Sequence, residues 1–129
     1  MHELHFEHKI WINELSFYED EIKIYEHRLE ELVMKSRNPD MLAQLEHFQN
    51  QFIREKEVID ILKHDINSHE HKLSEYAETH PIAIEHVHFK DHSDLRDRME
   101  RFYKIWIELK EEFYAFLLKY YNQPSEAEA

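Results

Sequence analysis

The 129-residue chain contains no glycine and no cysteine, and only three prolines. Tight turns, β-bulges and left-handed backbone positions depend largely on such residues, so their scarcity argues against a sheet protein. Phosphate-binding loops, dinucleotide-binding fingerprints and nucleophile elbows also need glycine where the backbone approaches a ligand or turns sharply. Nucleotide-dependent chemistry on a standard motif is therefore excluded.

The lack of cysteine removes disulfides, thiolate metal ligands and cysteine nucleophiles together. Any metal site must therefore use His, Asp, Glu or water.

Acidic residues outnumber basic ones. The chain has 16 Lys and Arg and 28 Asp and Glu, which gives a net charge of −12 at pH 7 with histidine neutral. This charge repels phosphate backbones and anionic membrane surfaces, so nucleic acid is not expected as a partner.

Long apolar runs are missing as well. No stretch approaches the ~20 apolar residues that a membrane span needs, and the opening run 1–11 has neither the basic start nor the apolar core of a signal peptide. We therefore expect a soluble, cytoplasmic protein without a membrane partner. We predict a single helical-bundle domain over residues 1–122, followed by a frayed polar tail at 123–129.

Apolar residues spaced alternately three and four apart dominate the chain. This periodicity predicts three long helices, at about residues 3–36, 39–78 and 92–122. Asn38 is a suitable N-cap and Pro39 a suitable first residue for the second helix. The short connection makes the first two helices antiparallel. We expect an all-α fold, an antiparallel up-down-up bundle of three long helices with a His-rich loop at 79–91 before the third.

A second apolar stripe accompanies the main seam of two helices. Its members recur every seven residues, and they are Ile10, Phe17 and Ile24 in the first helix and Ile107, Tyr114 and Tyr121 in the third. Three helices of this length do not obviously cover both stripes. A homodimer, or a helical protein partner, would complete the bundle over them. The alternative is that the aromatic residues partly cover themselves.

Histidine is the chemically suggestive residue, with twelve copies in the chain. Most helical histidines map to outer heptad positions, but His8, His69 and His92 fall in the seams of three different helices. Counting along antiparallel helices from the turn near residue 38 puts all three at one end of the bundle. Neutral imidazoles from three elements can meet at ~2.1 Å from one ion and leave a fourth position open. The sequence therefore predicts a divalent metal site there.

Two further residues are candidate ligands of this site. Asp65, one turn from His69, would serve as the fourth ligand or would fix a histidine tautomer, and His88 lies on the same line if the third helix begins early. Zinc is the default ion for three imidazoles, with copper, iron and nickel as alternatives. The competing interpretation is a coiled-coil-like interaction or scaffold module without metal or catalytic chemistry, whose histidines form a pH-responsive polar cap. The sequence indicates no substrate or reaction.

Glu55 is the other polar residue in the seam. It lies at mid-helix, far from the histidines. The same counting brings it near Lys104, so we expect an ion pair between them that fixes the register of the second and third helices.

Overall fold

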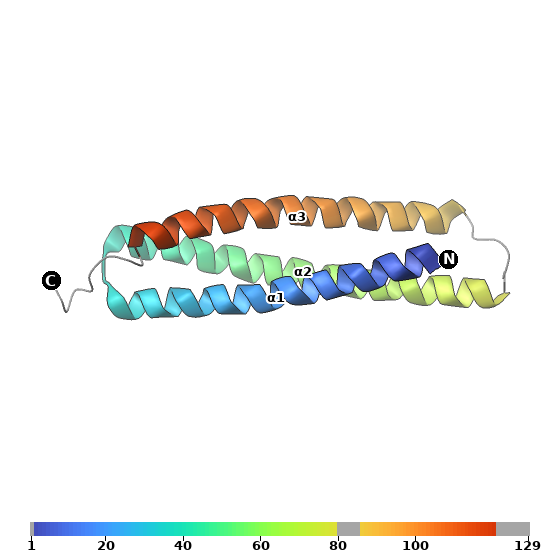
Figure 1. Ribbon diagram of the computed structural model, residues 1–129, viewed down its shortest axis with the longest axis horizontal. Helices are drawn as coiled ribbons and strands as arrows, with labels where there is room; N and C mark the ends of the chain where they lie inside the picture. Colours follow the sequence, from blue (N-terminus) through green and yellow to red (C-terminus); the bar gives the residue numbers. More distant parts are fainter. Residues whose placement is uncertain (1, 80–85, 121–129) are drawn as a thin grey trace.

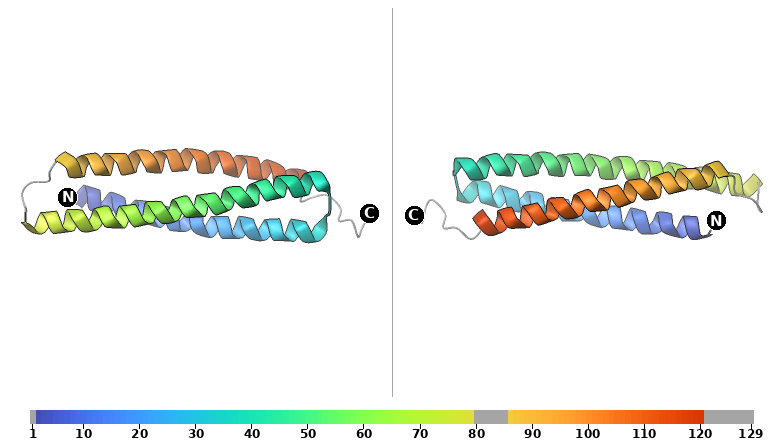
Figure 2. Two further views of the ribbon diagram at one scale, coloured as in Figure 1. Left: turned by 180° about the vertical axis from the view of Figure 1, so that it is seen from behind. Right: turned by 90° about the horizontal axis from the view of Figure 1, so that it is seen from above.

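The computed structural model describes residues 2–79 and 86–120. They form three helices, α1 (His2–Lys35), α2 (Pro39–Thr79) and α3 (His86–Tyr120). α2 returns antiparallel to α1, and α3 runs back alongside both, which makes an elongated bundle (Figures 1 and 2). The predicted all-α, up-down-up arrangement of three long helices is confirmed.

The turn between α1 and α2 is built around Asn38. Its side-chain Oδ1 accepts hydrogen bonds from the backbone N–H groups of Asp40 at 2.9 Å and Met41 at 3.2 Å. These are two of the donors that the first turn of a helix leaves without an intrahelical partner. Pro39 occupies the first helical position, where the missing N–H costs no hydrogen bond. The predicted N-cap and first residue of the second helix are confirmed.

The predicted start of the third helix is wrong. The periodicity predicts a loop up to residue 91, whereas α3 begins at His86. Residues 86–91 include no glycine or proline, and intrinsic propensities differ too little among them to stop a helix against favourable packing. The His88 ring lies 4.9 Å from the Tyr76 ring and 6.3 Å from the His69 ring, measured between centroids. These contacts extend the α2–α3 seam by one turn.

Some predictions fall outside the described residues. They are the remainder of the loop at 80–85, Tyr121, the helix end at 122 and the tail at 123–129. In the part of the chain that is described, no helix combines the length and the apolarity that crossing a bilayer requires.

The core is one continuous seam of apolar side chains from all three helices. Its largest fully buried members are Trp106, Phe52 and Phe113. Burial of each such side chain contributes roughly 1.5–3 kcal/mol, so the seam is the main source of stability. Within the described residues, four buried polar side chains interrupt it, namely His8, Glu55, His69 and His92. A buried polar group needs a partner, and each of these four therefore calls for an explanation.

Glu55 does not find the predicted partner. Its side chain is 3% exposed and borders a cavity of about 430 Å³ between α2 and α3. Within the described part of the chain the carboxyl group makes no ion pair with Lys104, which lies on the exposed face of α3. Burial raises the pKa of Glu55 above its ordinary value. The expected ion pair is wrong, because position 104 points away from the seam.

Candidate metal centre

Three buried imidazoles meet at the end of the bundle where α1 and α3 begin. The ring centroids of His8 and His69 are 5.3 Å apart, those of His8 and His92 4.9 Å, and those of His69 and His92 5.9 Å. One ring nitrogen from each residue lies within 4.8 Å of the other two. Nitrogens bound to one tetrahedral ion at ~2.1 Å are roughly 3.4 Å apart. Only small side-chain movements therefore separate this cluster from a three-coordinate metal site.

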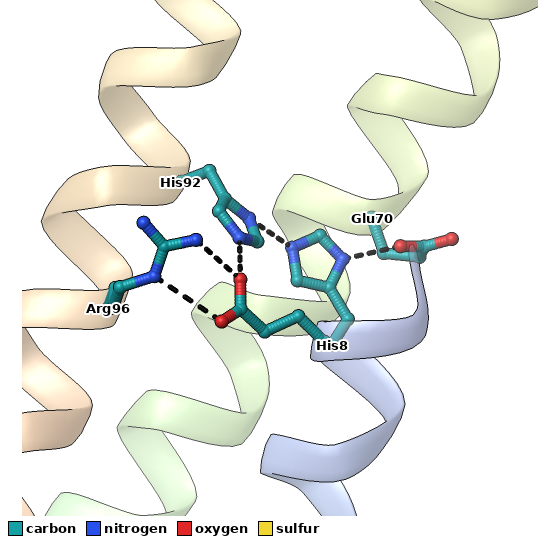
Figure 3. A network of polar contacts seen from close by, with 5 residues as sticks. His8, Glu70, His92 and Arg96 are labelled. Atoms are coloured by element: carbon teal, nitrogen blue, oxygen red, sulfur yellow. Dashed lines mark hydrogen bonds and ion pairs between the residues drawn. The ribbon is translucent and has the colours of Figure 1, made fainter. Parts of the chain in front are cut away.

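Two carboxylates accept hydrogen bonds from the ring nitrogens of His8 and His92 that face away from the cluster. His8 Nδ1 donates a hydrogen bond to Glu70 Oε2 at 2.5 Å, and His92 Nε2 donates one to Glu7 Oε1 at 2.5 Å (Figure 3). An ionised carboxylate only accepts hydrogen bonds, so the ring nitrogen that faces it must carry the proton. In a neutral ring the lone pair is then on the opposite nitrogen. The carboxylates thus turn the lone pairs of both rings inward.

Both carboxylates are held in their ionised form. The Arg96 guanidinium donates to Glu7 Oε1 at 2.7 Å and to Oε2 at 3.3 Å, and this interaction lowers the pKa of Glu7. Burial opposes ionisation of Glu70, but hydrogen bonds from His8 and His5 outweigh it and lower the pKa of Glu70. At neutral pH both groups therefore act as acceptors that fix the tautomers of His8 and His92.

Within the helices that the structure describes, the ring nitrogens that face the centre of the cluster lack hydrogen-bond donors. His8 Nε2 lies 3.0 Å from His92 Nδ1, and His69 Nε2 is buried with no hydrogen-bond partner among the described residues. Burial, and then the proximity of the other two histidines, lowers the pKa of His69 to about 4. Burial likewise lowers the pKa of His92. Two neutral rings whose lone pairs face one another repel, and a proton or a metal ion between them would relieve this repulsion.

Of the two further candidate ligands, His88 belongs to a group of potential metal ligands among the described residues and Asp65 does not. Asp65 Oδ2 accepts a hydrogen bond from Arg98 Nη2 at 2.8 Å, and Asp65 belongs to neither group of potential metal ligands found in the described chain. His88 joins His69 and Asp91 in the second such group, whose ligand atoms also lie within 4.8 Å of one another. In this part of the chain Asp91, and not Asp65, is therefore the carboxylate grouped with a histidine of this cluster, and it is grouped with His69 and His88 alone. Metal ligation by any of these residues stays a prediction.

Surface cavities reach the cluster from two different faces. One, of about 320 Å³, lies between α2 and α3 and borders His69. The other, of about 450 Å³, lies between α1 and α2 and borders His8 and Glu70. Water or a small ligand can therefore approach the buried rings from either side.

Sequence reasoning missed the charged groups around the imidazoles. Glu7, Glu70, Arg96 and Asp91 all lie next to seam positions, where charged residues ordinarily face solvent. The signal that could have found two of them is adjacency, because Glu7 precedes His8 in the chain and Glu70 lies at the same height on α2. A seam histidine needs a partner for its outer nitrogen, and a neighbouring carboxylate is one of the usual partners.

No protein-family model matches the chain, and comparisons with curated proteins and with solved structures give no match. A three-helix bundle serves many unrelated functions, so the fold alone assigns none. The function must be argued from the geometry and chemistry of the buried histidine cluster.

Proposed function

We propose that this protein binds one divalent metal ion through His8 Nε2, His69 Nε2 and His92 Nδ1, which we call the inner site. Three neutral imidazoles with an open fourth position are the ligand set of many zinc sites. Zinc is therefore the expected ion. Copper, iron and nickel also bind imidazole and are the alternatives that the ligand set admits.

The facing lone pairs of His8 and His92 carry this proposal. A proton shared between these two nitrogens would relieve their repulsion, since they lie 3.0 Å apart. That proton would leave the buried His69 Nε2 without a partner. One metal ion would use all three nitrogens. The outward hydrogen bonds to Glu7 and Glu70 follow the carboxylate–histidine–metal pattern that orients ligands and raises their basicity.

A bound ion would link all three helices at the end where α1 and α3 begin. Each ligand comes from a different helix, so binding opposes separation of that end of the bundle. Binding to the folded state alone stabilises it by about 2.7 kcal/mol when free metal is at 100 times the dissociation constant. A water molecule in the fourth position would have access to solvent through the cavity beside His69.

The test is the metal content of protein purified without an affinity tag or added metal. We expect one equivalent of metal by mass spectrometry and a melting temperature that falls when a chelator is added. His69→Ala should lose both properties. His27→Ala should keep both, because His27 is 67% exposed and, among the residues that the structure describes, pairs with Glu30 and Glu31 of its own helix. Wild-type protein that neither contains metal nor is stabilised by added zinc would refute the proposal.

The second apolar stripe favours a further function, self-association, and we propose a second copy of the chain as its partner. The stripe is exposed, with Phe17 60%, Ile24 55% and Ile107 55% accessible. Its seven-residue repeat is the spacing by which helices of two chains interlock in a coiled coil. Sedimentation equilibrium should therefore give the mass of a dimer, both with and without metal.

A further inference from the structure

His69 belongs to two groups of potential metal ligands. His8 and His92 complete one group, and His88 and Asp91 complete the other. His88 Nδ1 resembles His69 Nε2 in being buried without a hydrogen-bond partner in the described chain. Two unsatisfied imidazole nitrogens in one place are costly unless something binds them. His69, His88 and Asp91, which we call the outer site, therefore have the features of a second cation site.

The outer site differs from the inner site in its exposure to solvent. His69 is 5% exposed, whereas Asp91 lies on the protein surface and His88 is half-buried. A cavity of about 320 Å³ between α2 and α3 borders both His69 and Asp91. The outer site is thus open to solvent through this cavity, while the rings of His8 and His92 are 3% and 2% exposed.

The charges around this cavity favour a cation. Its lining includes three carboxylates and two cationic side chains, namely Asp65, Asp91, Asp94, Lys72 and Arg98. Asp65 and Arg98 pair with one another at 2.8 Å and largely cancel. Asp91 and Asp94 then outweigh Lys72. The net negative charge of this cavity raises the local concentration of divalent cations and accelerates their association.

We infer that the outer site receives a divalent metal ion from solvent and passes it to the inner site through their shared ligand, His69. This inference rests on the proposed function. The ion exchanges water first for Asp91 and His88 and then for His69. It next releases Asp91 and His88 as His8 and His92 replace them. In this route His69 binds the ion through Nε2 at both sites, so the two sites hold one ion in turn.

Stepwise exchange explains why such a site would be useful. The ligands of the inner site are almost fully buried, so an ion that enters in one step must give up most of its hydration shell before the imidazoles replace it. Replacing one water at a time by a protein ligand avoids an intermediate that has lost its coordination. The outer site then lowers the activation barrier for both association and dissociation of the ion and leaves the equilibrium affinity of the inner site unchanged.

The experiment measures association and dissociation of Zn²⁺ by stopped flow with a fluorescent zinc indicator. The double variant His88→Gln with Asp91→Asn should associate and dissociate about tenfold more slowly than wild type. Its equilibrium affinity should be the same as that of wild type. Asp94→Asn is the matched control, because it removes the same charge from the same cavity and leaves the outer site intact. Circular dichroism checks that each variant is folded.

Several outcomes separate this inference from the proposed function. Unchanged rates in the double variant with wild-type affinity would overturn the outer site and leave the inner site standing. Rates that fall equally in Asp94→Asn would show electrostatic attraction without ligation and would also overturn it. Two zinc ions bound at once to wild type would contradict transfer through a shared His69. No zinc bound to wild type would refute the inner site itself.

Discussion

His8 Nε2 and His92 Nδ1 face each other at 3.0 Å, and each ring donates a hydrogen bond from its far side to a carboxylate. This arrangement makes protons and metal ions competitors for the same pair of nitrogens. The carboxylates favour a positive charge between the rings, whereas burial disfavours a proton on His92. A metal ion shared with His69 spreads its charge over three ligands and avoids a fully charged imidazolium in the core.

Removal of one outer carboxylate should weaken metal binding without removing a ligand. In Glu70→Gln the amide oxygen can still accept from His8 Nδ1, but the negative charge that raises the basicity of His8 is lost. We expect a loss of about 10- to 100-fold in zinc affinity, the usual effect of such a substitution. Competition against a chromophoric chelator of known affinity measures it.

The control for this variant is Glu75→Gln. Glu75 pairs at 3.0 Å with His71, and both side chains are more than half exposed, at 66% and 75%. Zinc affinity should therefore be the same as in wild type. Equal affinities in Glu70→Gln and wild type would show that the hydrogen bond to Glu70 does not orient a metal ligand.

The metal-free protein should lose stability as the pH falls from 7 towards 4. Unfolded histidine binds a proton near pH 6.5, whereas burial lowers the pKa of folded His69 to about 4. The unfolded state therefore binds more protons in this window. As the pH falls, the free energy of unfolding decreases by up to about 3 kcal/mol because of His69 alone. The lowered pKa of His92 acts in the same direction.

Urea unfolding in the presence of a chelator, at pH 7, 6, 5 and 4, measures this dependence. His69→Leu lacks the titrating group and should show a shallower fall in stability. His64→Leu is the matched control on the same helix, because His64 is exposed, and it should follow the wild-type profile. A free energy of unfolding that is flat between pH 7 and 5 in wild type would contradict neutral, buried imidazoles.

Which side chains are buried could be predicted from the sequence, and so could the layer in which three of them meet. Spacing of three and four residues fixes the side of a helix that faces the core, and a constant rise of 1.5 Å per residue fixes heights along antiparallel helices. These two rules alone place His8, His69 and His92 in one layer. The convergence of their rings follows from backbone geometry and needs no knowledge of rotamers.

The partners of long side chains could not be predicted in this way. Asp65 turns to Arg98, and Lys104 points to solvent away from Glu55. Such choices depend on rotamers at flanking positions, where several partners compete with water at similar free energy. The early start of α3 could not be predicted from apolar spacing either, because His88, which contacts α2 from the first turn, is not an apolar residue.

Replacement of Glu55 by an apolar residue should stabilise the bundle at neutral pH. Burial raises the pKa of Glu55, so its contribution to stability is fully present only below the unfolded pKa near 4.5 and is lost as the pH rises through the folded value. Glu55→Leu should gain about 1 kcal/mol at pH 7, because it removes a carboxyl group whose ionisation burial opposes, and the gain is limited because Glu55 borders a cavity. Thermal and urea unfolding at pH 7 and at pH 4 measure the gain.

The pH comparison distinguishes charge from packing. At pH 4 the wild-type carboxyl group is largely protonated, so the advantage of Glu55→Leu should shrink. Glu57→Leu, at an exposed position of the same helix, should change stability little at either pH. A Glu55→Leu variant less stable than wild type at pH 7 would mean that Glu55 has a favourable partner in solution.

Self-association should depend on the exposed apolar stripe of α1. Phe17 is 60% accessible in the single chain, and a dimer formed over the stripe would bury it at the centre. Phe17→Glu places a charge there, and we expect the dimerisation constant to weaken by about 30-fold or more, as for a central interface residue. Sedimentation equilibrium over a range of protein concentrations measures the change.

Ile53→Glu provides the comparison for Phe17→Glu. Ile53 is 48% exposed on α2 and does not belong to the stripe, so this variant has the same added charge on a different face. It should dimerise as wild type does, because a charge that stays in solvent costs little. If both variants dissociate to the same extent, net charge and not the stripe governs association. A wild-type protein that is monomeric at every concentration would refute the dimer and leave the inner site unaffected, since all its ligands come from one chain.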